Sequence, residues 1–287
     1  MKLLDGKVVI VTGAGGGLGR EHALALARAG AAVVVNDLGG ARDGTGASRS
    51  MADAVVAEIR AAGGEAVASH DDVATLEGGR RICQTALDAF ERVDALVSNA
   101  GILRDKSFSN TTEELWDPVV AVHLRGAYCV THPVWLHLKQ RGAGGSIVHT
   151  SSTSGLNGNF GQSNYGAAKA GVFGLMRCLS IEGQKYGIRV NALAPVAWTR
   201  LTSDLPGFED PARKAQLDPA LVSPLVVYLA SDLAKDVTGR TFFVGGGRIA
   251  EMRMVTAAGV TRKESGGLWS AEEIAAQMAP GRILLAE

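Results

Sequence analysis

The sequence alternates short runs of β-branched residues with longer stretches of helical periodicity. We predict seven strands, over residues 7–12, 32–36, 66–69, 95–98, 146–150, 189–193 and 241–244. The helical stretches between them cover residues 18–28, 51–61, 76–90, 113–140 and 165–186, and each is long enough to connect two parallel strands. This order predicts an α/β fold with a doubly wound, seven-stranded parallel sheet of the Rossmann type.

Composition narrows the classes of partner. The 287 residues are 46% hydrophobic, enough for a sizeable core, and 29 basic residues balance 29 acidic ones. Without excess charge, binding to nucleic acid or to a membrane is not expected, and the predicted partner is a small molecule. Neither a secretion signal nor a membrane-spanning stretch is evident, which predicts a cytoplasmic protein.

The chain has three cysteines, Cys83, Cys129 and Cys178. They are widely spaced and lie in apolar surroundings. This pattern favours buried thiols in a reducing compartment over a disulfide framework or a metal site. No metal is therefore expected.

A glycine-rich turn separates the first predicted strand from the first predicted helix. It runs from Thr12 to Gly19, with Gly13, Gly17 and Gly19 at the spacing of a dinucleotide fingerprint. Glycine permits positive φ and close approach of the backbone to a pyrophosphate, while the N-terminus of the following helix stabilises negative charge. A tight turn without a ligand is the alternative. Five glycines between strand and helix favour a nucleotide site, which would include Leu18.

An acidic residue, Asp37, ends the second predicted strand. A carboxylate there can accept hydrogen bonds from the adenosine ribose hydroxyls. The same charge repels a 2′-phosphate, and no Arg or Lys adjoins it, which favours NAD over NADP. Taken alone, Asp37 is more typical of a solvated strand end than of a ribose contact. The loop that follows, residues 39–50, is rich in Gly, Asp and Ser, and we expect it to be mobile without ligand.

Tyr165 and Lys169 are four residues apart at the start of a predicted helix, so they share one face. Ser152 closes the preceding strand, across a loop over residues 153–164 that is rich in Gly and Asn. A strand end and a helix start can converge in this way. Taken singly, each residue suits an ordinary surface position, and only their joint placement predicts a proton-transfer site.

Alcohol oxidation requires a group that takes the hydroxyl proton as hydride leaves. A tyrosine with an ordinary pKa of about 10 is a poor base at neutral pH. The ammonium of Lys169 and a positive nicotinamide ring would both lower the pKa of Tyr165. Ser152 would hold the substrate oxygen, so Ser152 and Tyr165 are the predicted substrate contacts. Tyr165 and Lys169 are also predicted cofactor contacts, with Lys169 at the nicotinamide ribose.

These motifs resemble those of the short-chain dehydrogenase family. The likeness rests on the glycine-rich turn, Ser98-Asn-Ala-Gly101, Ser152 and the Tyr165-to-Lys169 segment, and it covers roughly residues 5–250. Within the family the chain is most similar to the (3R)-hydroxyacyl-CoA dehydrogenases of peroxisomal multifunctional enzymes, a group that includes hydroxysteroid dehydrogenases, and to their bacterial relatives. Residues 35–40, 99–105, 123–126, 158–165 and 181–183 carry this narrower likeness.

The resemblance implies an NAD-dependent oxidoreductase that interconverts a secondary alcohol and a ketone, as hydroxyacyl-CoA or hydroxysteroid. It also implies further cofactor contacts: Asp72 and Val73 at the adenine, Asn99, Ala100 and Gly101 at the ribose, and Pro195, Ala197 and Thr199 in the nicotinamide loop. Family members are usually dimers or tetramers joined through the helices around residues 113–140 and 165–186, so a homo-oligomer is expected.

Two positions depart from the family pattern. His123 stands where many members have an Asn that orients a water leading to the catalytic Lys. It either keeps this proton relay as a fourth catalytic residue or is an ordinary helix histidine. Val196 replaces the usual Gly after Pro195, which leaves the expectation of cofactor binding intact.

The chain divides by pattern into a dinucleotide-binding domain, residues 1–249, and a C-terminal extension, residues 250–287. In the extension, Ser270 and Glu273 form a capping-box pattern that opens a short helix through Met278. Its apolar side chains, Trp269 among them, need a partner. We expect the extension to pack near an active site, its own or a neighbouring subunit's, or at a subunit interface.

A function of another class remains as the alternative: a catalytically idle NAD-binding protein that senses redox state or serves as an assembly subunit. The joint presence of Ser152, Tyr165 and Lys169 argues against it, since a sensor does not need all three. Substrate choice is expected to depend on a pocket formed by residues 199–220 and on the extension.

Overall fold

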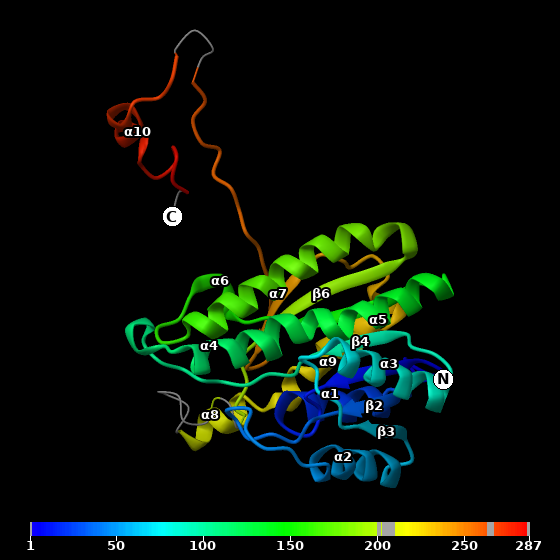
Figure 1. Cartoon of the computed structure of the whole chain (residues 1–287). Coiled ribbons are helices and arrows are strands. Elements are labelled where there is room, and N and C mark those ends of the chain that lie inside the picture. The colour runs from blue at the N-terminus through cyan, green and yellow to red at the C-terminus, as the bar shows by residue number, and fades with distance from the viewer. Residues whose placement is uncertain (1, 200–201, 203–209, 263–266, 286–287) are drawn as a thin grey trace. The chain divides into compact units, whose positions relative to one another are not determined.

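The computed structural model describes residues 2–199, 202, 210–262 and 267–285. The chain forms two compact units, Met1–Glu251 and Met252–Glu287. The first unit is a sheet with helices on both faces (Figure 1). Part of the predicted substrate pocket, residues 200–201 and 203–209, lies outside the described residues.

The sheet has the strand order β3-β2-β1-β4-β5-β6-β7-β8. Its strands are β1 Val8–Thr12, β2 Ala32–Asn36, β3 Glu65–Ser69, β4 Ala95–Ser98, β5 Gly145–Thr150, β6 Ile188–Pro195, β7 Thr241–Gly245 and β8 Arg248–Met252. The strands from β1 to β7 pair in parallel. The order reverses between β1 and β4, and a ligand crevice opens at the carboxyl ends of the strands at such a point. The predicted fold class is confirmed.

The eighth strand corrects the predicted count of seven. Gly246 and Gly247 both have positive φ, 56° and 75°, and turn the chain directly from β7 into β8. Two consecutive residues with positive φ make the tight turn that joins neighbouring strands. The segment showed no strand pattern because β8 is mostly exposed and carries Arg248 and Glu251, not a buried apolar face.

Helices cover the two faces of the sheet. One face packs against α1 Gly17–Arg28, α2 Ser50–Ala61 and α9 Ser223–Ala230. The other packs against α3 Leu76–Phe90, α5 Gly126–Arg141 and α7 Ser163–Glu182. Successive residues of a strand point to opposite faces, so Val9 and Val11 join the first core cluster and Val8 and Ile10 the second.

The single helix predicted over residues 113–140 is interrupted. It consists of α4 Glu113–Val120, a π-helical turn η2 Ala121–Arg125, and α5. A π turn keeps the helical run of side chains, so hydrophobic periodicity does not reveal it. Such turns occur mostly at functional sites, and this one contains His123.

The loop predicted over residues 153–164 also contains a helix, α6 Thr153–Asn157. Five residues are too few to show periodicity, and the Ser152 side chain caps the helix by accepting a hydrogen bond from the Ser154 N–H. The remaining helical segments are η1 Phe108–Asn110, η3 Gln184–Tyr186, α8 Pro211–Gln216, η4 Pro219–Leu221, η5 Asp232–Ala234 and α10 Ala271–Gln277.

Cys178 corrects a second expectation. Cys83 and Cys129 are buried, but Cys178 lies exposed on α7. Met176 and Leu179 nearby in the sequence are apolar, yet helical geometry turns Cys178 away from the sheet.

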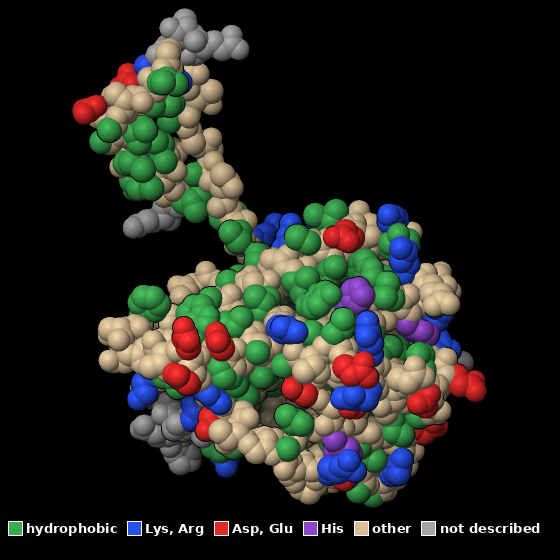
Figure 2. All heavy atoms as spheres, viewed as in Figure 1, with side chains coloured by type: hydrophobic (Ala, Val, Ile, Leu, Met, Phe, Trp, Pro, Cys, Tyr) green, Lys and Arg blue, Asp and Glu red, His purple; other side chains and the backbone are tan. Residues whose placement is uncertain are grey.

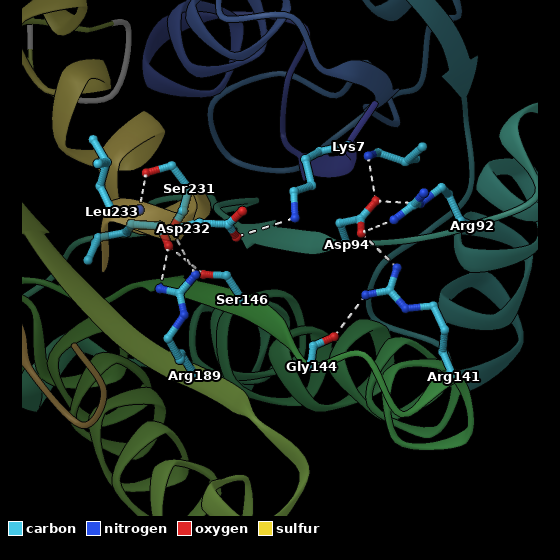
Figure 3. A network of polar contacts seen from close by, with 12 residues as sticks. Lys7, Arg92, Asp94, Arg141, Gly144, Ser146, Arg189, Ser231, Asp232 and Leu233 are labelled. Atoms are coloured by element: carbon cyan, nitrogen blue, oxygen red, sulfur yellow. Dashed lines mark hydrogen bonds and ion pairs between the residues drawn. The ribbon is translucent and has the colours of Figure 1, made fainter. Parts of the chain in front are cut away.

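A polar network ties together the amino-terminal ends of the strands (Figure 3). Asp94, which is 7% exposed, accepts hydrogen bonds from the Val8 N–H at 2.8 Å and from the guanidinium groups of Arg92 and Arg141. Burial acts to raise the pKa of Asp94, but the hydrogen bonds from Arg92, Val8 and Arg141 outweigh it and hold the pKa below its ordinary value. This end of the sheet is opposite the crevice, so the network stabilises the fold.

The second unit contains α10. The predicted capping box is confirmed: the Ser270 hydroxyl accepts from the Glu273 N–H, and the Glu273 carboxylate accepts from the Ser270 N–H. Hydrophobic side chains gather on the surface of this unit, Leu268 and Met278 among them (Figure 2). Within the described part of the chain, no helix is long and apolar enough to cross a bilayer.

Candidate active site

A cavity lies at the carboxyl ends of β1, β2 and β4, where the strand order reverses. Ten of the predicted cofactor residues line it: Gly13, Gly17, Leu18, Asp37, Asp72, Val73, Asn99, Ala100, Gly101 and Thr199. Five others do not line it: Gly19, Tyr165, Lys169, Pro195 and Ala197. Several further residues line the cavity that were not predicted as cofactor contacts, including Leu38, Ala41, Gly44, Met51 and Ile102.

The glycine-rich turn brings bare backbone to this cavity. Gly13 and Gly17 have φ of 63° and 51°, conformations that favour glycine. A Cβ atom on Gly13 would lie 2.7 Å from the Cα of Ala100, and one on Gly19 would lie 2.0 Å from the carbonyl oxygen of Gly13. Gly19 therefore permits close packing of α1 on the turn. With the N-terminus of α1 at the cavity, the arrangement fits a pyrophosphate.

Asp37 links this turn to the loop after β2. One carboxylate oxygen accepts from the Gly15 N–H at 2.7 Å and the other accepts from the Gly39 N–H at 2.7 Å. These bonds fix the carboxylate at the wall of the cavity. An acidic group in this position suits ribose hydroxyls and disfavours a phosphate in their place.

The loop over residues 39–50 packs against the segment that follows β4. The Leu103 N–H donates to the carbonyl of Arg42, and Arg104 donates through Nε to the carbonyl of Asp43 at 2.7 Å and through a terminal nitrogen to that of Glu114. Arg104 therefore connects the cofactor loop to the start of α4. Sequence patterns did not show this contact, because the two segments are distant in the chain. The expected mobility of the loop without ligand stays a prediction.

Asn99 joins the end of β4 to the glycine-rich turn. Its side-chain amide donates to the carbonyls of Thr12 and Gly13, at 3.1 and 3.3 Å. Its own N–H and that of Ala100 both donate to the Thr12 hydroxyl. Asn99 thus ties the end of β4 to the glycine-rich turn and also lines the cavity.

Ser152, Tyr165 and Lys169 converge beyond the end of β5. The Ser151 hydroxyl donates to the carbonyl of Lys169 at 2.9 Å, which draws the end of β5 onto α7. The Lys169 ammonium donates to the carbonyl of Thr150 and lies 5.6 Å from the centre of the Tyr165 ring. The structure therefore brings together three residues that the sequence separates by a short helix and a loop.

Burial controls the ionisation of this group. Burial raises the pKa of Tyr165, and the negative charge of Asp105 raises it further. A hydrogen bond with the Ser152 hydroxyl lowers the same pKa but does not outweigh burial. Burial also lowers the pKa of Lys169 to about 7. The prediction that Lys169 lowers the pKa of Tyr165 is therefore wrong for the chain without cofactor, in which this pKa is raised. An added positive charge, such as an oxidised nicotinamide, would favour the phenolate.

His123 lies beside this group. Its Nε2 is 2.8 Å from the carbonyl oxygen of Ile102 and 3.1 Å from the Ile102 nitrogen. Burial, and then the charge of Lys169, lower the pKa of His123 well below its ordinary value, so the imidazole is neutral. Gly101 is required here, because a Cβ atom on it would lie 2.3 Å from the His123 ring.

A second set of polar contacts joins the segment after β4 to α6 and to the start of α7. Gln162 donates to the Asp105 carboxylate at 2.7 Å and accepts from the Ser154 hydroxyl at 2.8 Å. The Asn164 side chain donates to the carbonyls of Arg104 and Leu115. These residues were not assigned from the sequence, although the segments that contain them carry the family likeness. Among the described residues, no cluster of three metal-ligating side chains occurs.

Comparison with known proteins places this chain in one family. A profile described as short chain dehydrogenase matches residues 7–205. The chain is 53% identical over 248 residues to a short-chain type dehydrogenase/reductase of Mycobacterium tuberculosis, covering 86% of this chain and 85% of that one. A crystal structure of a short chain dehydrogenase from Mycobacterium avium superposes with a TM-score of 0.84 at 43% identity, covering 99% of this chain and all of that one.

Two further relatives bear on the reaction. The peroxisomal multifunctional enzyme type 2 of Mus musculus is 50% identical over 263 residues, covering 91% of this chain but only 35% of the mouse protein. The hydroxyacyl-CoA dehydrogenase ChsB1 of Mycobacterium tuberculosis is 37% identical over 287 residues, covering 96% of this chain and 88% of that one. With these likenesses and this site, the chain belongs to the short-chain dehydrogenase family, whose members are oxidoreductases acting on CH–OH groups.

Proposed function

We propose that this protein is an NAD-dependent dehydrogenase that interconverts a 3-hydroxyacyl-CoA and a 3-ketoacyl-CoA. The observation that carries the proposal is the convergence of Ser152, Tyr165 and Lys169 beyond β5, in the same unit as a cavity whose glycine-rich turn fits a dinucleotide. A nicotinamide cofactor is the hydride carrier that such a site requires.

In the proposed reaction the nicotinamide supplies hydride chemistry. Tyr165 takes the proton of the substrate hydroxyl as the alcohol is oxidised, and returns it in the reverse direction. Ser152 orients the substrate oxygen by hydrogen bonding. The ammonium of Lys169, 5.6 Å from the Tyr165 ring centre, favours the phenolate electrostatically.

The choice of NAD rests on Asp37. Its carboxylate lines the cavity and is held by two backbone N–H groups, so it cannot easily turn away from a bound ribose. A 2′-phosphate at this place would meet a fixed negative charge.

The choice of an acyl-CoA rests on one relative. The hydroxyacyl-CoA dehydrogenase ChsB1 is similar to this chain over nearly the whole length of both proteins. We therefore place hydroxyacyl-CoA ahead of hydroxysteroid. The proposal includes a homodimer or homotetramer, in line with the exposed hydrophobic side chains of Tyr128 and Leu136 on α5 and Ile181 on α7. It also includes the cytoplasmic location, which cell fractionation would test.

A substrate panel tests the proposal. Short- and long-chain 3-hydroxyacyl-CoAs and hydroxysteroids would be offered with NAD and with NADP, and NADH or NADPH formation measured. We expect turnover of 3-hydroxyacyl-CoA with NAD. Turnover of hydroxysteroids alone would contradict the acyl-CoA substrate and favour a steroid. Turnover with NADP alone would contradict the proposal that Asp37 selects NAD.

A further inference from the structure

A second histidine lies close to the proposed proton-transfer group. His149 is on β5, next to Thr150, and its side chain is fully buried. Neither of its ring nitrogens has a hydrogen-bond partner among the described residues. Buried polar groups are nearly always hydrogen-bonded, to protein or to ordered water. A buried imidazole whose two nitrogens have no partner among the described residues therefore points to hydrogen bonding with ordered water.

The sheet geometry shows which way His149 points. Ile147, two residues earlier on β5, belongs to the core cluster packed under α3, α5 and α7. Strand side chains alternate, so His149 faces the same layer, toward α7. The carbonyl of the next residue, Thr150, accepts a hydrogen bond from Lys169. Burial, followed by the charge of Lys169, lowers the pKa of His149 to about 4, so the imidazole is neutral, with one donor and one acceptor nitrogen.

Other unpaired polar groups occur in this layer. On α5 the hydroxyl of Thr131 is buried and has no partner among the described residues. Thr131 shares a helix face with Ala127, which is buried, and with Val134, which belongs to the core cluster under α3, α5 and α7. On η2 the Nδ1 of His123 is likewise unpartnered within the described chain. The Lys169 ammonium has three donor hydrogens, and one goes to Thr150.

We propose that His149 holds a buried water beside Lys169, and that this water accepts a hydrogen bond from the Lys169 ammonium. His149 is then a positioning residue that stays neutral. It helps Lys169 to keep its charge although the side chain is buried, and this charge favours the Tyr165 phenolate. The inference rests on the proposed roles of Tyr165 and Lys169.

The pH dependence of alcohol oxidation tests the inference. The titratable groups that bear on it are Lys169 and Tyr165 from α7, His123 from η2, and Asp105 from the segment after β4, whose charge raises the Tyr165 pKa. In His149→Leu the water beside the Lys169 ammonium loses the residue that holds it, so Lys169 keeps its charge less well. The Tyr165 pKa then rises, and oxidation begins at higher pH. We expect the apparent pKa of kcat to rise by about one unit, which lowers kcat about tenfold at pH values below it.

Two further variants make the result specific. His149→Asn and His149→Gln carry an amide donor and acceptor near the positions of the two ring nitrogens, and at least one should restore the wild-type pH dependence. The matched control is His22, also fully buried, whose Nδ1 lies 2.9 Å from the Ser223 hydroxyl. It belongs to the opposite face of the sheet, under α9, so His22→Leu should leave the pH dependence unchanged.

A high-resolution crystal structure of the wild-type protein gives an independent readout. We expect an ordered water within hydrogen-bond distance of a His149 nitrogen and of Lys169 Nζ. A dry site, or an unchanged pH dependence in an active His149→Leu enzyme, would overturn the inference. A wild-type protein with no turnover would instead contradict the proposed function, and the crystal structure would still decide whether the water is present.

Discussion

The imidazole of His123 and the phenol ring of Tyr165 meet edge to face, with centroids 5.0 Å apart and planes at 88°. His123 is anchored on its other side by the backbone of Ile102, through Nε2. The π-helical turn at residues 121–125 places the imidazole between the Tyr165 ring and the end of β4. These contacts indicate that His123 positions the Tyr165 ring, whether or not it also takes part in a proton relay.

Substitution of His123 should separate these roles. An Asn side chain can donate to the Ile102 carbonyl and accept from its N–H, so His123→Asn should retain most of the activity. His123→Ala removes the hydrogen bond between Nε2 and the Ile102 backbone and also the contact with Tyr165, so kcat should fall about tenfold or more. Steady-state kinetics with a 3-hydroxyacyl-CoA checks this. Equal losses in both variants would indicate that the imidazole itself moves a proton.

Tyr165→Phe should abolish turnover while leaving NADH binding within about a factor of two of wild type. The variant loses only the phenolic oxygen, which takes up the substrate proton. Loss of a general base of this kind lowers the rate by about 10²- to 10⁴-fold. NADH fluorescence titration and an activity assay measure the two effects. Tyr128→Phe, on the exposed surface of α5, is the matched control. Full activity of Tyr165→Phe would favour the sensor reading or a different base.

Asp37→Ser should shift cofactor preference toward NADP. The substitution removes the fixed negative charge and the acceptors of the Gly15 and Gly39 N–H groups. We expect the KM for NAD to rise about tenfold and kcat/KM for NADP to increase, since one lost charge-assisted hydrogen bond is of this order. Asp53→Ser, on α2, is a control for the loss of an acidic residue nearby. An unchanged ratio of kcat/KM for NAD to kcat/KM for NADP would mean that Asp37 does not distinguish the two cofactors at the ribose.

Asp94→Asn should destabilise the fold in a pH-dependent way. The folded-state pKa of Asp94 lies below its ordinary value, so its contribution to stability is present above about pH 4 and is lost as the pH falls further. At pH 7 we expect the free energy of unfolding to drop by about 3 kcal/mol, because Arg141 and Arg92 lose a buried partner. Denaturant unfolding at pH 7 and pH 3 measures this. A difference that persists undiminished at pH 3 would contradict it.

Removal of the C-terminal extension tests its proposed place at an active site or subunit interface. A chain ending after Arg253 keeps β8 and the whole sheet, which a cut after Gly247 would not. We expect a changed preference for acyl-chain length or a changed oligomeric state, with little change in the stability of the remaining unit. Kinetics on a chain-length series and sedimentation velocity give the two readouts. A truncated enzyme identical to the full chain in both would show that the exposed apolar residues of the extension serve neither purpose.

Much of the fold follows from local pattern. The limits predicted for the helix at residues 76–90 agree with α3, because its apolar residues repeat at helical spacing between Thr75, which caps it, and Glu91, which ends it in a left-handed conformation. The capping box of Ser270 and Glu273 was equally readable. By contrast, β8 and α6 carry no periodic signal, since their formation depends on a neighbouring strand and on the Ser152 cap.

The sequence by itself determined the parallel α/β sheet, the glycine-rich turn and the candidate residues Ser152, Tyr165 and Lys169, because alternation, glycine spacing and helical periodicity are local properties of a chain. Only the tertiary structure decided that Arg104 contacts the loop over residues 39–50, that His123 packs on Tyr165 and that His149 is buried with neither ring nitrogen paired among the described residues. These contacts join residues far apart in the chain. Their energies depend on burial, which exists only after the sheet and its helices have packed.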